Sequence, residues 1–210
     1  MRPLLLILGL LALAGAWLGP LPHLARHAFF AHMTMHMAVV AVAAPLLALG
    51  IAGSAFDPVS RKPAWFPPIP LSIVELIVVW AWHAPALHHV ARHGVAGLMA
   101  EQGSFLVAGL LVWLSALGGA SSLRRSRARA GLVALLLISM HMTLLGALLA
   151  MTPRPLYAHA VHGSTLTPLD DQHLGGAIML LAGGVSYLAG GLWLTAGLVR
   201  GAIINREASA

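Results

Sequence analysis

The chain has 210 residues, of which 59% are hydrophobic and only 9% charged, and its mean hydropathy is +0.87. Soluble domains carry about 25% charged residues, so this composition excludes a soluble globular protein and indicates an integral membrane protein. Cysteine is absent, which excludes disulfides, thiolate metal sites and cysteine catalysis. The net charge of +6 comes from basic residues in short loops between apolar runs. Membrane topology explains such a distribution, so no binding to nucleic acid needs to be assumed.

Long apolar runs separated by polar loops predict one all-α domain over residues 1–210. A transmembrane helix needs roughly 17–25 apolar residues, so we expect a polytopic helical bundle with about six spans in the lipid bilayer. The expected spans cover residues 4–20, 29–50, 71–91, 98–117, 131–151 and 168–199. The first run is short and resembles the apolar region of a signal peptide, but we expect it to be retained as a helix.

The second span opens with the hexapeptide His-Met-Thr-Met-His-Met at residues 32–37. On a helix, His32 and His36 lie on one face a turn apart, and Met33 and Met37 repeat that spacing on the adjoining stripe. Imidazole binds both oxidation states of copper, and thioether sulfur favours Cu(I). Methionine also fills apolar cores, and a lone membrane histidine often only donates a hydrogen bond. The hexapeptide alone leaves both interpretations open.

Two prolines are expected to disturb the second and third spans. Pro45 lies near the far end of the second span and predicts a kink. Pro85 follows Trp82 and His83 in the third span and leaves a carbonyl one turn back without its helical donor. Such breaks persist in membrane helices where neighbours or a polar cavity satisfy the freed group. His83 is therefore expected beside a polar site, with Trp82 as part of its wall.

The later spans carry further polar groups. Glu101 lies near the start of the fourth span, and His141 lies in the middle of the fifth, next to Met142. The sixth opens with Thr-Pro-Leu-Asp at residues 167–170, a helix start in which Asp170 fills the capping role. Acidic residues at helix N-termini complement the helix dipole by only about 1 kcal/mol. Asp171 is therefore the stronger candidate for a role in a site.

The basic residues predict the orientation of the spans. With the N-terminus inside, nine of the 12 lysines and arginines fall in cytoplasmic segments, and only Arg26, Arg92 and Arg154 fall in outer ones. This bias predicts an N-in, C-in topology. On that frame no histidine lies in a cytoplasmic loop. The outer halves of several spans are therefore expected to converge on one polar site.

These positions define a candidate copper site, for Cu(I) or Cu(II), toward the outer side. The expected ligands are His32, His36, His83, His141, Met33, Met37, Met142 and Asp171. The residues expected to orient these ligands or to wall the site are Glu101, Gln172 and Trp82. Glu101 is also able to bind metal itself. The histidines of the outer connections are expected to be solvated or to touch metal transiently; they are His23, His27, His88, His89, His93, His159 and His162.

Three other functions fit the same residues. Histidines on different spans ligate haem in many b-type haem or quinone redox proteins, and His141 paired with His36 or His83 would suit that role. A metal or proton-coupled transporter would use Asp171 and His141 as a relay. A structural scaffold would use the histidines only as hydrogen-bonding groups. No nucleophile–base pair or phosphate-binding loop is evident in the sequence, so we do not expect an enzyme.

An ordered set of short motifs resembles the CtaG family, which is associated with caa3-type cytochrome c oxidase. The motifs are His32-Met33-x-x-His36, Ala44-Pro45-Leu46, Trp82-His83-x-Pro85, Glu101 with Trp113, and Asp171-Gln172-x-x-Gly175-Gly176-x-Ile178-Met179. One departure is Gln102, which stands where many relatives carry histidine.

The resemblance implies a multi-pass assembly factor in the bacterial plasma membrane. Its implied role is the assembly or metallation of a haem-copper oxidase, with copper bound on the outer side. The implied partners are subunits of cytochrome c oxidase or an extracytoplasmic copper chaperone. The resemblance alone introduces the oxidase, whereas the His/Met site was inferred from the residues.

Overall fold

The computed structural model describes residues 1–120, 124–157 and 166–207, and over these ranges the chain is helical with no strand. Five helical segments are long and apolar enough to cross a membrane: Phe29–Ile51, Pro63–His83, Val95–Leu117, Ser126–Met151 and Pro168–Arg200. A shorter apolar helix, α1 (Arg2–Leu18), completes the set. The prediction of an all-α polytopic bundle is confirmed. His159 and His162 lie outside the described residues.

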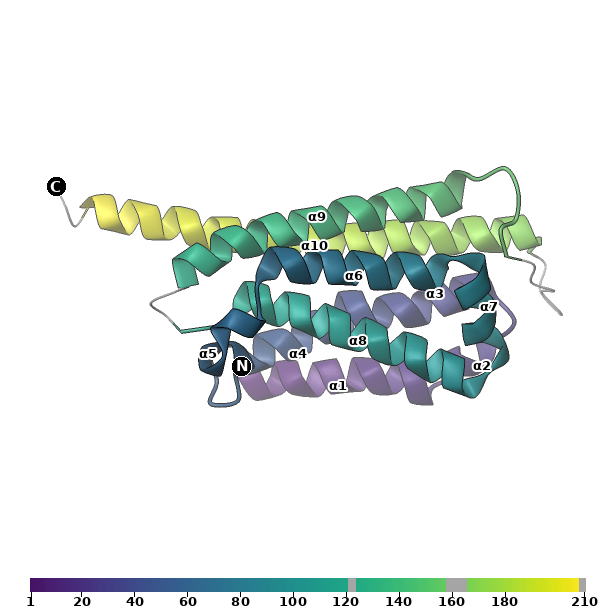
Figure 1. Cartoon of the computed structure of the whole chain (residues 1–210), viewed down its shortest axis with the longest axis horizontal. Helices are drawn as coiled ribbons and strands as arrows, with labels where there is room; N and C mark the ends of the chain where they lie inside the picture. The colour runs from purple at the N-terminus through teal and green to yellow at the C-terminus, as the bar shows by residue number, and fades with distance from the viewer. Residues whose placement is uncertain (121–123, 158–165, 208–210) are drawn as a thin grey trace.

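Helix α1 packs along the second span. Its Gly9 lies against Leu47, and Leu6 lies against Gly50 of the partner helix. A short helix, α2 (Leu21–Leu24), then leads to the second span. Figure 1 places α2 at one end of the bundle, together with α7 and the beginnings of α3, α8 and α10. We call this the histidine end.

The second span consists of three consecutive segments. They are α3 (Phe29–Met37), the π-helix η1 (Ala38–Ala43) and α4 (Ala44–Ile51). Pro45 has no N–H to donate to the carbonyl of Ala41, and the hydroxyl of Ser186 donates to that carbonyl instead, at 2.7 Å. A neighbouring helix thus satisfies the group that the proline frees, and the sequence-based kink takes the form of a π-helix.

The third span ends earlier than the sequence suggested. After the short helices α5 (Pro58–Arg61) and η2 (Pro63–Trp65), helix α6 (Pro68–His83) ends at His83. Ala84 is extended, with φ −65° and ψ 134°, because Pro85 disfavours a helical conformation in the residue before it. The expected span over residues 71–91 is therefore divided, and a separate helix α7 (Pro85–His93) lies across the histidine end (Figure 1).

The remaining spans are α8 (Val95–Leu117), α9 (Arg124–Met151) and α10 (Pro168–Glu207). Helices α9 and α10 lie side by side over much of their length (Figure 1). Two glycines allow the close approach: a Cβ added to Gly146 would lie 2.7 Å from the amide nitrogen of Leu180, and one added to Gly176 would lie 2.5 Å from that of Ala150. Small residues at these contacts let the two backbones meet.

The opposite end of the bundle is held by Asp57, which precedes α5 and is almost fully buried. Its carboxylate accepts hydrogen bonds from the amides of Gly53, Val59 and Gly119 and from the hydroxyl of Ser60. Burial alone would raise the pKa of Asp57, but these four hydrogen bonds outweigh it and hold the pKa below its usual value. Asp57 therefore ties the loop before α5 to the end of α8.

Candidate metal centre

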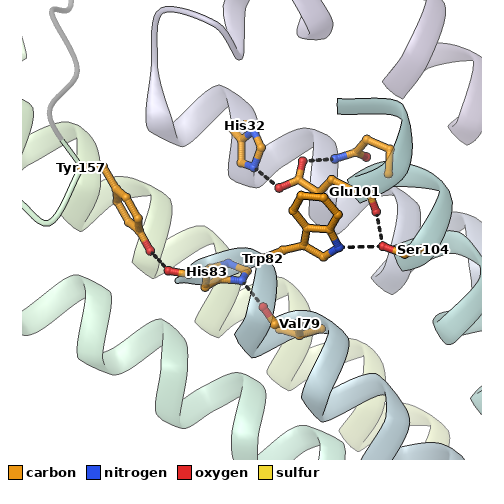
Figure 2. A network of polar contacts seen from close by, with 8 residues as sticks. His32, Val79, Trp82, His83, Glu101, Ser104 and Tyr157 are labelled. Atoms are coloured by element: carbon orange, nitrogen blue, oxygen red, sulfur yellow. Dashed lines mark hydrogen bonds and ion pairs between the residues drawn. The ribbon is translucent and has the colours of Figure 1, made fainter. Parts of the chain in front are cut away.

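Three buried side chains from three helices meet at the histidine end. They are His32 of α3, His88 of α7 and Glu101 of α8. The Nε2 atom of His32 lies 3.1 Å from Oε1 of Glu101 (Figure 2), and one ligand atom from each of the three residues lies within 4.8 Å of the others. Two imidazoles and a carboxylate at this spacing are able to share one metal ion.

His88 is the main correction to the sequence-based site. It was expected to be solvated or only a transient metal contact, but only 3% of its surface is exposed, and its ring lies 5.0 Å from that of His32. The reason is the break at Ala84 and Pro85, which lets α7 turn across the bundle with His88 and Ala91 facing inward. His89, the next residue, is exposed as expected.

A second pair of histidines lies next to this cluster. His36 is one turn after His32 on α3, and its ring centroid is 5.5 Å from that of His83 and 3.8 Å from that of Phe105. Neither ring nitrogen of His36 has a hydrogen-bond partner among the described residues, although the side chain is fully buried. Such unpaired buried groups are costly and call for an explanation.

His83 is fixed in one tautomer. Its Nδ1 lies 2.7 Å from the carbonyl oxygen of Val79 (Figure 2), and a carbonyl only accepts, so Nδ1 carries the hydrogen. The lone pair is then on Nε2, which is buried and has no partner among the described residues. A histidine that donates one ring N–H to a backbone carbonyl and keeps the other nitrogen free has the arrangement of most metal-ligating histidines.

Hydrogen bonds hold Glu101 and Trp82 in place. The amide of Gln102 donates to Oε2 of Glu101 at 3.2 Å, so the glutamine at the position of the family departure supports the carboxylate. The indole N–H of Trp82 donates to the hydroxyl of Ser104 at 2.8 Å, and that hydroxyl donates to the carbonyl of Glu101 (Figure 2). Trp82 thus links α6 to α8 beside the cluster.

Tyr157 is a site residue to which the sequence analysis assigned no role. Its hydroxyl donates to the carbonyl of His83 at 2.7 Å (Figure 2), and its ring lies 4.8 Å from Phe29 and 4.2 Å from His88. Burial raises the pKa of Tyr157, which keeps the hydroxyl protonated as a donor. The only available signal was a lone tyrosine in the loop after the fifth span, and its partner is 74 residues away.

Asp171 and Gln172 connect α10 to its neighbours. The carboxylate of Asp171 accepts from the amide of Phe29 at 2.7 Å and from that of Phe30 at 2.8 Å, so it caps α3. The side chain of Gln172 accepts from the amide of Leu156 at 2.6 Å. Asp171 therefore fixes the end of the helix that carries His32, and its role as a ligand stays a prediction.

Comparison with known protein families identifies the family of this chain. A model of the cytochrome c oxidase caa3 assembly factor family, CtaG, matches residues 1–201. The chain belongs to this family. The resemblance inferred from the ordered motifs between about Phe29 and Met179 is thus confirmed, and the match extends beyond them on both sides. Neither the curated proteins nor the solved structures gave a match.

The three methionines expected as copper ligands in this caa3 assembly factor lie in the adjoining core. Met33 packs beside Gly175, and Met37 and Met142 meet at Gly183, where an added Cβ would lie 4.0 Å from the sulfur of Met37 and 3.3 Å from Cβ of Met142. All three methionines are buried. Met33 and Met37 of α3 and Met142 of α9 thus pack against glycines of α10.

His141 is the next residue before Met142 on α9. It is buried, and neither of its ring nitrogens has a hydrogen-bond partner in the described part of the chain. Within that part, no hydrogen bond or ring contact joins it to His36 or His83. The structure therefore brings together His32, His36 and His83 of the expected histidines, and it adds His88.

A cation also faces the assembly factor's site. Arg92 lies one turn after His88 on α7 and is half-buried. Burial lowers the pKa of Arg92 to about 10, and the nearby carboxylates of Asp171 and Glu101 oppose that shift. The guanidinium therefore stays charged at neutral pH and partly balances the two carboxylates.

Proposed function

We propose that this caa3 assembly factor binds copper at the histidine end and supports its delivery to the cytochrome c oxidase. The observation that carries the proposal is the set of buried imidazole nitrogens without partners, on His36 and His83, beside the triad His32, His88 and Glu101. Each buried polar atom without a partner costs about 1–3 kcal/mol, and a bound metal would offset that cost.

The chemistry of the donors fits copper. Imidazole accepts Cu(I) and Cu(II), and the thioethers of Met33, Met37 and Met142 would favour Cu(I) where they reach the ion. His32, His88 and Glu101 would form one group of ligands, and His36 with His83 would form a second group one turn along α3. His141 and Asp171 remain candidate ligands that only a binding experiment will place.

The transfer partner would be a subunit of the oxidase or an extracytoplasmic copper chaperone. The predicted N-in, C-in topology puts the histidine end on the outer side of the bacterial plasma membrane, where such a partner would meet it. The chain itself would make and break only metal–ligand bonds, as expected of a non-enzymatic factor.

The test is copper content and visible spectrum of the detergent-purified protein after anaerobic Cu(I) loading. We expect roughly stoichiometric copper in the wild type and loss of most of it in His36→Ala/His83→Ala. His27→Ala, an exposed histidine at the same end, is the control and should retain copper. Met142→Ala should weaken binding more than Met140→Ala, because Met142 is buried and Met140 is exposed.

Two results would contradict the proposal. One is a wild-type protein that retains no copper under these conditions, which would favour a scaffold. The other is a strong Soret band in the purified protein, which would favour a haem-binding redox protein. In cells, His36→Ala/His83→Ala should lower the copper content and activity of the oxidase, whereas His27→Ala should leave both unchanged.

A further inference from the structure

The outward face of α7 carries a second pair of histidines. His89 and His93 are one turn apart, and both are exposed. Their ring centroids lie 3.8 Å apart with the ring planes at 26°, so the two imidazoles already lie side by side. On the same helix, His88 lies on a different face, which is buried and contributes to the triad.

The local hydrogen bonding leaves a lone pair available for metal. Nδ1 of His93 lies 2.9 Å from the carbonyl oxygen of His89, and a carbonyl only accepts, so this nitrogen carries the hydrogen. The lone pair of a neutral His93 is then on Nε2. Two histidines four residues apart on one helical face present nitrogens to a single ion, which is the ligand spacing of helical zinc sites.

We propose that His89 and His93 form a surface metal site, distinct from the buried cluster, that binds Cu(II) through two imidazole nitrogens. Imidazole ligands with water in the remaining positions suit borderline divalent ions, and Cu(II) is bound most tightly in the first-row series. Both rings are exposed, so water is able to complete the coordination of a divalent ion there.

The helix itself pre-organises the pair. Helix α7 is anchored by its buried residues His88 and Ala91, so little rotational freedom is lost when the exposed pair closes on an ion. His23 and His27 are also four residues apart, but α2 ends at Leu24, and their rings are 5.1 Å apart at 43°. The pair on α7 is therefore the better chelator of the two.

The position suggests a use as an entry site. A copper ion held by His89 and His93 would lie on the exposed face of the helix that supplies His88 to the triad. Copper would be collected there as Cu(II) and passed inward as Cu(II) to the imidazoles and carboxylate of the triad, with no change of oxidation state. This use rests on the proposed function, whereas the binding of Cu(II) to the pair does not.

The test is Cu(II) binding to the full chain in detergent. Equilibrium dialysis measures the number of bound ions and their affinity, and electron paramagnetic resonance identifies the coordinating nitrogens. We expect His89→Ala/His93→Ala to bind one equivalent less Cu(II) than the wild type and to lose the signature of two coordinated imidazole nitrogens. Each single variant should weaken that site by about tenfold or more. Leu87→Ala, an exposed neighbour without a ligand atom, should match the wild type.

The proposal is wrong if the double variant binds as much Cu(II), as tightly, as the wild type. Anaerobic Cu(I) loading separates this outcome from failure of the proposed function. His89→Ala/His93→Ala should retain buried Cu(I), and His36→Ala/His83→Ala should retain the surface Cu(II) signal. Absence of the surface Cu(II) signal from the wild type would refute the surface site. Absence of bound Cu(I) alone would refute only the buried site.

Discussion

Polar side chains buried in this bundle differ in how many of their atoms are hydrogen-bonded. Asp57 and Asp171 each use both carboxylate oxygens to accept backbone amides. Glu75, in the middle of α6, accepts from the hydroxyl of Tyr187 with one oxygen, and its other oxygen has no partner among the described residues. His36 has no partner at either nitrogen. The fully hydrogen-bonded groups hold helices together. The groups without hydrogen bonds mark the places where a bound ligand would add most to the stability of the fold.

The pH dependence of stability provides a test of Asp57. Because the folded-state pKa lies below that of the unfolded chain, the ionised carboxylate stabilises the fold at neutral pH, and this contribution is lost as the pH falls below about 4. Asp57→Asn should cost about 2 kcal/mol at pH 7. The difference from the wild type should stay constant from neutral pH down to about pH 4 and shrink as the pH falls further, measured by thermal unfolding in detergent.

Asp170→Asn is a control for this experiment, because Asp170 is exposed and its carboxylate accepts a hydrogen bond from the hydroxyl of Thr167 at the start of its own helix. It should change stability by less than about 1 kcal/mol across the same range. A difference between Asp57→Asn and the wild type that stays constant with pH would mean that the charge of Asp57 does not contribute.

Individual site residues could be predicted where the signal is local. His32, His36 and His83 were found because spacing on a helix and a nearby proline are visible in the sequence. Glu75 was assigned no role, although a lone carboxyl in an apolar run is itself a signal. Its partner Tyr187 is 112 residues away, and no periodicity connects the two.

At the scale of elements, the junction between α6 and α7 determines the composition of the site. The sequence predicted a break at Pro85 but not the direction of the following helix, which depends on packing against α8. That direction decides that His88 faces inward and His89 outward. The capping of α3 by Asp171 was equally hidden, because donor and acceptor are more than 140 residues apart.

Pro85→Ala tests the role of this junction. Without the proline, Ala84 is free to become helical, and α6 would continue past His83 and carry His88 away from His32. We expect greater modification of His88 by diethyl pyrocarbonate, measured by mass spectrometry, and weaker retention of Cu(I). Pro168→Ala, at the first turn of α10, should affect neither. Unchanged protection of His88 would show that packing alone sets the path of α7.

At the scale of the whole molecule, the bundle depends on close contact between its two longest helices. Composition and apolar runs predicted an all-helical, polytopic bundle, because these properties depend on local hydrophobicity. The pairing of α9 with α10 was not predicted in detail, since glycines occur throughout the sequence and only the structure distinguishes those at a contact.

Glycine-to-alanine substitutions separate these cases. Gly146→Ala should destabilise the protein by about 1–3 kcal/mol, because the added methyl group would lie 2.7 Å from the backbone of Leu180. Gly103→Ala is the matched control: an added Cβ meets nothing within 4 Å there, so higher helix propensity should leave stability equal or raised by up to about 1 kcal/mol. Unfolding by heat in detergent measures both. Equal stability of the two variants would contradict the packing argument.

The π-helix Ala38–Ala43 changes the rotation between the two halves of the second span, α3 and α4. A π-helical turn accommodates one residue more than an α-helical turn, and each residue rotates an α-helix by about 100°. The π-helical segment therefore sets how far α3, with His32 and His36, is rotated about the helix axis relative to α4. Deletion of one residue within 38–43 would let the span become a regular helix and would turn the two histidines away from Glu101 while every residue of the site was still present.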